Sequence, residues 1–112
     1  MKRAYAPPSE DDGFRILVDR IWPRGMKRDQ IRIDLWLKEV APSDELRSWF
    51  AHDPGRWAEF KERYHSELAS KGDLVGIISE KISSGDVTLV FGAKDERLNN
   101  AVALKEYLLR ES

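Results

Sequence analysis

Phe14-Arg15-Ile16-Leu17-Val18-Asp19 opens a stretch that continues as Arg20-Ile21-Trp22-Pro23-Arg24-Gly25. Its first half is a short, β-branched apolar run, with Gly13 before it and a turn-forming Trp-Pro-Arg-Gly segment after it. A run of this length between turn signals is typical of a buried strand. We therefore predict a strand over residues 14–19 and a loop that leaves its carboxyl end.

Three further segments have strand character. Residues 86–92 form a second apolar run between glycines, and two such continuous runs favour a parallel sheet that is covered on both faces. Residues 33–40 alternate apolar and polar side chains in part, which predicts an outer strand, with a short helix as the alternative. Residues 2–5 predict one more short strand before Pro7 and Pro8.

Four helices are predicted from apolar residues at helical spacing, with start and stop signals that agree with the period. The first begins after Ser43 as N-cap and ends at residues 52–55, and the second carries Trp57, Phe60 and Tyr64 on one face. The third covers residues 73–83, and the fourth runs from residue 99 or 100 to residue 110.

The order of strands and helices predicts the fold class. Strands alternating with helices imply right-handed crossovers and a mostly parallel sheet. We expect an α/β three-layer sandwich with about four short strands and helices on both faces. The 112 residues and their hydrophobic content of 41% predict one domain over residues 1–112.

Composition excludes several classes of function. The 19 basic and 20 acidic residues nearly cancel, so nucleic-acid binding is not expected from overall charge. The chain has no cysteine, which excludes disulfides, thiolate metal sites and cysteine nucleophiles. No segment has the roughly 18 apolar residues of a membrane helix. We expect a cytoplasmic protein without membrane association, and we predict no metal site and no cofactor.

The loop after the first strand concentrates positive charge. Residues 20–32 contain five basic residues against Asp29 alone. In one interpretation, Arg20, Arg24 and Lys27 hold an anionic group while Trp22 stacks on a planar ligand. In the alternative, Asp19 pairs with an arginine, Trp22 packs into the core, and the turn residues only shape the loop.

The loop after the second strand, residues 92–100, should lie beside the first one, because parallel strands end at the same edge of a sheet. Lys94 is predicted to reach a bound anion there, and Asn99 or Asn100 to cap the final helix. The alternative is capping with a surface charge pair. The two histidines, His52 and His65, show no metal-ligand spacing.

Several segments together resemble the YeaO-like branch of the DUF488 family. They are residues 15–25, which include the motif "VDRxWPRG", then residues 43–47, 60–64 with 67–68, and 93–95 with 100–101. The resemblance covers nearly the whole chain. It implies an α/β domain distantly related to rhodaneses and cysteine phosphatases, in a branch without an assigned reaction.

The departures from that pattern concern the sulfur chemistry. Val18-Asp19-Arg20 matches a "DVR" motif of other DUF488 proteins, but Gly92 and Asn99 stand where their later loop has cysteines. Ala101 stands where an arginine is expected, and Leu98 where the branch itself has a histidine. The resemblance therefore implies a fold that has lost its nucleophile.

Three functions remain open. The preferred one is binding of a small anionic ligand, such as a nucleotide or phosphorylated metabolite. The residues predicted to bind it, called here the candidate ligand-binding set, are Asp19, Arg20, Trp22, Arg24, Lys94 and Asn100. The second is an enzyme that uses Asp19 as base or Lys94 as electrostatic stabiliser. The third is an interaction module for a partner protein or nucleic acid, and the sequence does not predict an oligomeric state.

Overall fold

The protein, described over residues 1–111 by a computed structural model, contains one sheet of four parallel strands in the order β1-β4-β2-β3. The strands are β1 (Lys2–Arg3), β2 (Phe14–Leu17), β3 (Leu35–Trp36) and β4 (Val87–Phe91). All four predicted strands are confirmed, and the α/β sandwich is confirmed with them. β2 and β4 are central neighbours, with Leu17 paired to Val90.

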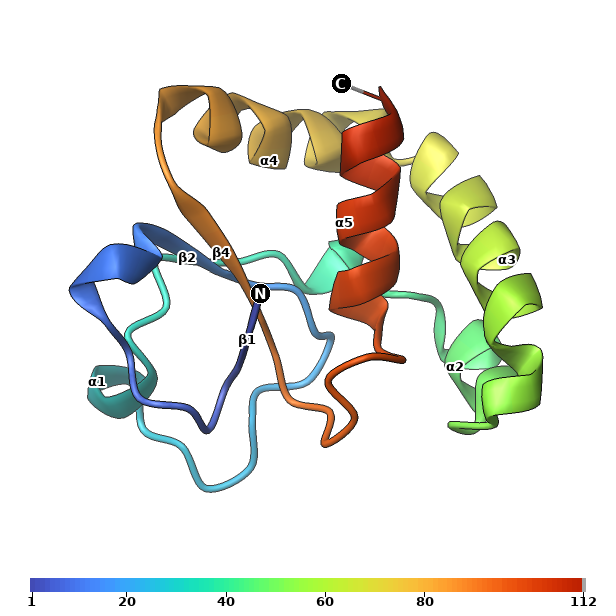
Figure 1. Ribbon diagram of the computed structural model, residues 1–112, viewed down its shortest axis with the longest axis horizontal. Coiled ribbons are helices and arrows are strands. Elements are labelled where there is room, and N and C mark those ends of the chain that lie inside the picture. Colours follow the sequence, from blue (N-terminus) through green and yellow to red (C-terminus); the bar gives the residue numbers. More distant parts are fainter. Residues whose placement is uncertain (112) are drawn as a thin grey trace.

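The helices are unevenly divided between the two faces of the sheet. α2 (Asp44–Phe50), α3 (Trp57–Ala69), α4 (Gly72–Ser84) and α5 (Asn100–Glu111) lie on one side of the strands, whereas α1 (Arg28–Ile31) lies alone on the other (Figure 1). The predicted third layer is therefore thin: α1 and the loop before it cover the second face. Three short 3₁₀ helices lie in the connections between these elements: η1 (Glu10–Asp12), η2 (Lys38–Val40) and η3 (Pro54–Arg56).

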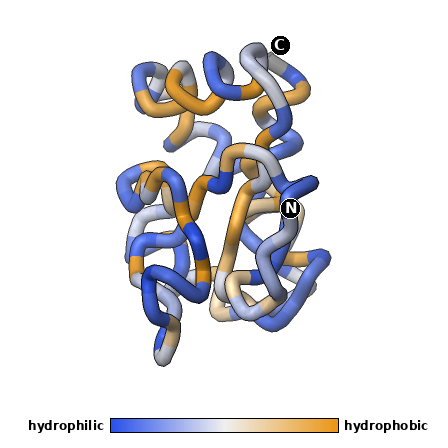
Figure 2. Tube along the Cα trace, turned by 90° about the vertical axis from the view of Figure 1, so that its left-hand side faces the viewer, coloured by the Kyte–Doolittle hydropathy of each residue, from blue (hydrophilic) through white to orange (hydrophobic). Residues whose placement is uncertain are grey.

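The alternation of side chains along the central strands divides the core. Ile16, Val18, Leu89 and Phe91 face the four longer helices, while Leu17 and Val90 face Ile31 of α1. Successive residues of a strand point to opposite faces, so continuous apolar runs fill both clusters. Figure 2 shows hydrophobic residues along the central strands and mostly hydrophilic loops at the lower end of the molecule.

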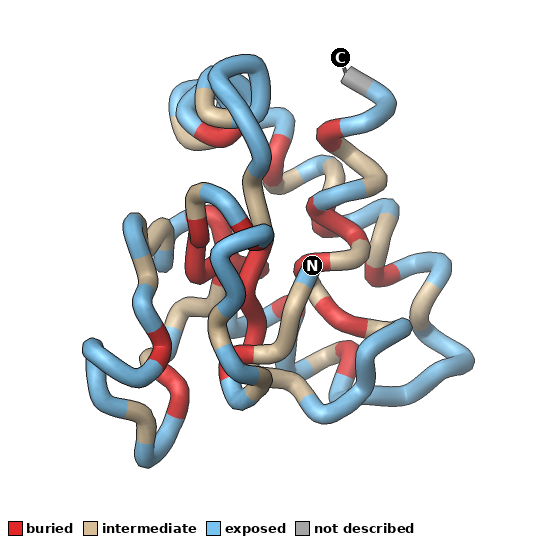
Figure 3. The backbone as a smooth tube through the Cα atoms, turned by 60° about the vertical axis from the view of Figure 1, so that its left-hand side comes forward, coloured by how far each residue is buried: buried red, intermediate tan, exposed pale blue. Residues whose placement is uncertain are grey.

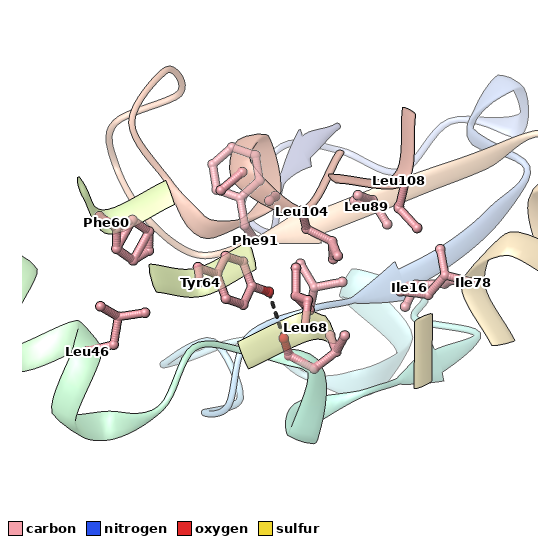
Figure 4. Packing of buried hydrophobic residues seen from close by; sticks show 14 of the residues in the cluster. Ile16, Leu46, Phe60, Tyr64, Leu68, Ile78, Leu89, Phe91, Leu104 and Leu108 are labelled. Atoms are coloured by element: carbon pink, nitrogen blue, oxygen red, sulfur yellow. Dashed lines mark hydrogen bonds between the residues drawn. The ribbon is translucent and has the colours of Figure 1, made fainter. Parts of the chain in front are cut away.

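The larger cluster includes one buried polar group with a defined partner. Tyr64 of α3 is fully buried, and its hydroxyl donates to the Val40 carbonyl at 2.6 Å (Figure 4). Because a buried hydroxyl is costly without a partner, this bond fixes η2 against α3. The chain that follows η2 then runs to α2, which supplies part of the site described below.

Residues 33–40 contain both the outer strand and the short helix that their sequence suggested. Leu35–Trp36 pairs with β2, and the next residues turn into η2. Sequence reasoning missed α1, η1 and η3, which have only three or four residues each and therefore no helical period. In the part of the chain that the structure describes, no helix is long and apolar enough to cross a membrane.

Candidate functional site

A cavity of about 410 Å³ lies at the carboxyl ends of β2 and β4. Its walls come from five segments: the residues after β2, the approach to α2, α2 with the residues that follow it, α3, and the β4–α5 loop with the start of α5. The loops at this lower end of the molecule are largely exposed, while the strands above them are buried (Figure 3). This is the edge at which parallel α/β folds usually bind ligands.

Asp19 joins the ends of the two central strands. One of its carboxylate oxygens accepts a hydrogen bond from the Gly92 backbone N–H at 2.7 Å, and the other accepts one from the Asn100 side chain at 3.1 Å. Burial raises the pKa of Asp19, although these two bonds and the charge of Arg47 oppose the shift. No arginine forms an ion pair with Asp19 within residues 1–111, in contrast to the packing interpretation of this loop.

Gly92 allows the close approach of Asp19 in this arrangement. A Cβ atom at position 92 would lie 3.1 Å from the Asp19 carboxylate, which is tighter than ordinary van der Waals contact. The residue stands where the sulfur-dependent relatives implied by the resemblance have a cysteine. A side chain here would crowd Asp19, whose carboxylate accepts from the Gly92 backbone N–H.

Arg20 combines a structural role with an unused donor. Its terminal nitrogens donate to the carbonyls of Ala41 and Pro42 at 3.3 and 3.4 Å and contact Glu39 at 3.5 Å. Its Nε is buried and makes no hydrogen bond, although it forms an ion pair with Asp44 at 3.8 Å. Within residues 1–111 it is the one buried side-chain nitrogen or oxygen without a hydrogen-bond partner. Such an orphan donor is unusual in a native fold.

Arg47 of α2 supplies a second guanidinium on the wall of the cavity. Its side chain is 43% exposed and forms an ion pair with Asp44 at 3.8 Å. Together with Arg20 it places two positive charges on the cavity lining against the single carboxylate of Asp19; both guanidiniums also pair with the exposed Asp44 outside the lining. The lining residues are therefore net positive, which favours an anionic ligand.

The amino end of α5 closes another side of the cavity. Asn99 caps this helix, because its side-chain oxygen accepts from the Val102 N–H at 3.0 Å. Asn100 instead donates to the Val18 carbonyl at 3.0 Å and to Asp19. The side chain of Asp95 accepts from the backbone N–H groups of Leu98 and Arg97, and these bonds lower the pKa of Asp95.

The remaining wall is apolar and aromatic. Phe50 and Phe60 line the cavity and stack with ring centroids 4.4 Å apart. Leu98, which replaces the histidine implied by the resemblance, also lines it and packs against the larger core cluster. His52 is exposed at the edge, with a left-handed backbone at φ 57°. The cavity thus pairs an apolar surface with two cations.

The structure brings together only half of the candidate ligand-binding set. Asp19, Arg20 and Asn100 line the cavity, whereas Trp22, Arg24 and Lys94 do not. Trp22 packs edge to face on Trp36 at 5.4 Å, and its indole donates to the Met26 carbonyl at 2.8 Å. Lys94 and Arg24 are exposed, and neither side chain makes a hydrogen bond or ion pair to the described residues.

Sequence reasoning did not identify Arg47, Phe60 or His52 as site residues. Arg47 and Phe60 belong to helices whose apolar period suggested packing alone, and His52 belongs to a helix-terminating segment. Only the tertiary approach of α2 and α3 to the β4–α5 loop brings them to the cavity. Among residues 1–111, no group of three or more His, Asp or Glu side chains is placed to hold a metal ion.

The fold and the site define a class: a small parallel α/β domain with a cationic cavity at the carboxyl ends of its strands and no cysteine beside it. The chain belongs to the DUF488 family, since residues 1–112 match the family described as the inactive DUF488-N3 subclade. The YeaO-like resemblance of the sequence is thereby confirmed.

Two relatives support this assignment. The chain is 39% identical over 107 residues to the uncharacterized protein YeaO of Escherichia coli, an alignment that covers 96% of this chain and 93% of that protein. It is 53% identical over 66 residues to an uncharacterized protein of Mycobacterium tuberculosis, covering 59% of this chain and 56% of that protein. No solved structure gives a significant match.

Proposed function

We propose that this domain is a cytoplasmic protein that binds a small anionic ligand, of the nucleotide or phosphorylated-metabolite class, in the cavity at the carboxyl ends of β2 and β4. Binding uses no cysteine chemistry. The observation that carries the proposal is Arg20, a cavity-lining residue whose buried Nε has no hydrogen-bond partner among the described residues. A phosphate or carboxylate oxygen in the cavity would pair with this guanidinium.

Three other features support the same ligand class. Arg47 adds a second guanidinium, and the amino end of α5 adds backbone N–H groups and a positive partial charge. Phe50 and Phe60, which stack on each other, give this part of the cavity an apolar wall for the rest of the ligand. Both a charged and a planar part are characteristic of nucleotides and many phosphorylated metabolites.

We prefer ligand binding to catalysis because the Asp19 carboxylate is already engaged in hydrogen bonds within the protein. Each of its two oxygens already accepts a hydrogen bond that holds the strand ends together, from Gly92 and from Asn100. A general base must instead direct an oxygen at the proton that it removes. Asp19 therefore acts here as a positioning residue for the loop that carries Arg20.

Isothermal titration calorimetry with inorganic phosphate, pyrophosphate and a panel of nucleoside phosphates tests the proposal. Arg47→Gln removes one cation from the cavity, and Arg24→Gln makes the same change on an exposed residue outside it. We expect at least one member of the panel to bind. Because hydrogen bonds to charged groups contribute about 1.5–3 kcal/mol, Arg47→Gln should weaken that binding roughly 10-fold or more. Arg24→Gln should leave it unchanged.

A second variant separates charge from geometry. Arg20→Lys keeps the positive charge but loses Nε and the planar fork, and it should also weaken binding. Thermal unfolding of each variant without ligand shows whether it is folded. Absence of heat with every member of the panel, or equal affinity in wild type and folded Arg47→Gln, would contradict an anion site in this cavity.

A further inference from the structure

A second basic surface lies outside the cavity, on α1 and the loop around it. Arg24, Lys27, Arg28 and Arg32 are all exposed there, and we call these four residues the basic loop. Within residues 1–111, none of their side chains makes a hydrogen bond or an ion pair. Every other arginine of that range except Arg97 is held by a carboxylate, a carbonyl or an imidazole.

Buried contacts of Trp22 and Ile31 anchor the basic loop to the sheet. Trp22 donates to the Met26 carbonyl and packs on Trp36, and Ile31 is completely buried against the sheet. The unpaired cations are therefore displayed by an anchored segment, on the side of the sheet away from α3 and α5 (Figure 1). A preformed surface loses little conformational entropy on binding.

Two large exposed apolar side chains lie in or beside this part of the chain. Ile21, which also lines the edge of the cavity, is 66% exposed, and Tyr5 is 44% exposed. Tyr5 is attached to the loop, because its hydroxyl donates to the Arg24 carbonyl at 3.1 Å. Exposed apolar groups next to arginines are typical of surfaces that bind proteins.

The distribution of charge along the chain favours a short acidic partner over a long polyanion. Residues 20–32 carry four net positive charges, while the whole chain carries −1, so the remainder of the chain is net acidic. A long polyanion such as nucleic acid would meet that acidic remainder, whereas a short acidic segment meets only the basic loop. We propose that the basic loop docks an acidic segment of a partner protein, with its carboxylates on the arginines and an apolar residue against Ile21 and Tyr5.

Fluorescence anisotropy with a labelled peptide tests this surface separately from the cavity. The peptide has glutamates on both sides of a leucine, and a second peptide replaces every glutamate with glutamine. The test variant is Arg24→Glu with Arg28→Glu. Its matched control is Arg97→Glu with Lys105→Glu, which changes the net charge equally on exposed residues outside the loop.

We expect the glutamate peptide to bind wild type and the control variant with similar affinity. The loop variant should bind at least tenfold more weakly, and binding should weaken with added salt. Arg47→Gln should bind the peptide as wild type does, so failure of the cavity proposal would not affect this result. No binding of the glutamate peptide, equal loss in both charge variants, or equal binding of the glutamine peptide would overturn the proposal. So would tighter binding of a single-stranded oligonucleotide that the loop variant abolishes.

Discussion

Asp19 connects three parts of the molecule through one carboxylate. It follows β2, accepts from the backbone of Gly92 after β4, and accepts from Asn100 at the start of α5. The sequence singled out Asp19 from its place at the end of a buried strand. It did not indicate the partners, since Gly92 and Asn100 lie more than 70 residues further along the chain.

Asp19→Asn should lower the free energy of unfolding by about 1–3 kcal/mol, because an amide NH₂ group would replace one of the two acceptors and face a donor. Urea unfolding followed by tryptophan fluorescence measures this change. Asp29→Asn, an exposed substitution in α1, is the control and should have little effect. Equal stability of Asp19→Asn and wild type would show that these bonds do not hold the loop.

The pH dependence of that difference has a definite sign. Burial raises the pKa of Asp19 in the folded protein, so between its ordinary value and the raised one the folded state binds more protons than the unfolded state. Stability contributed by Asp19 is therefore greatest below its ordinary pKa and is lost as pH rises through the folded pKa. The stability difference between wild type and Asp19→Asn should shrink over that rise in pH.

Among the elements, α5 matters most for the site, because its amino end forms one wall of the cavity. Two adjacent asparagines lie at its start, Asn99 just before the helix and Asn100 as its first residue, and the sequence left open which of them is the cap. Asn99 takes that role, donating also to the Asp95 carbonyl at 2.9 Å, while Asn100 turns to Asp19. The choice depends on where β2 ends in space, which local sequence does not encode.

Asn99→Ala should destabilise the protein by about 1–2 kcal/mol, since it removes the cap of α5 and a bond within the β4–α5 loop. Urea unfolding measures the loss. Ser83→Ala, at the exposed end of α4, removes a local bond to Glu80 and should change stability by less than about 0.5 kcal/mol. An unchanged midpoint for Asn99→Ala would mean that α5 does not depend on this cap.

The long helices were predictable for a physical reason. α2 begins directly after Ser43, whose hydroxyl accepts from the Leu46 N–H at 3.1 Å, and α3 buries Phe60 and Tyr64 at helical spacing. Caps and periods of this kind are local properties of the chain. α1 has neither, because Lys27 provides no side-chain cap and Ile31 is its one buried residue. Its position is set by the sheet face that it covers.

At the scale of the whole molecule, a buried ion-pair network ties the strands together on the side opposite the cavity. Asp12 contacts Lys2 at 2.9 Å and Arg15 at 2.5 Å, and its carbonyl accepts from Thr88 at 2.7 Å. The partners come from β1, β2 and β4. The hydrogen bond from Lys2 is the largest cause of a lowered pKa for Asp12, with Ser9 and Arg15 contributing and burial opposing.

This network predicts how acid affects the fold. Because the pKa of Asp12 is lowered on folding, its contribution to stability is present above the ordinary pKa and is lost as pH falls through the folded pKa. Asp12→Asn should be less stable than wild type at neutral pH and should lose less stability between roughly pH 5 and pH 2. Urea unfolding at both ends of that range measures this, and Asp11→Asn, an exposed neighbour, is the control. Parallel pH profiles for wild type and Asp12→Asn would contradict it.

Local sequence was sufficient for the fold class, for the four strands and for the four longer helices, because apolar period, caps and turn residues act over a few positions. It was also sufficient to exclude cysteine chemistry and to locate the edge where Asp19 and Asn100 meet. The cavity itself depends on residues from five separate segments, and Arg47 and Phe60 enter it through helix packing alone. Long-range packing likewise drew Trp22 beneath its loop, because burying an indole against Trp36 removes more apolar surface from water than exposing it at a ligand site would.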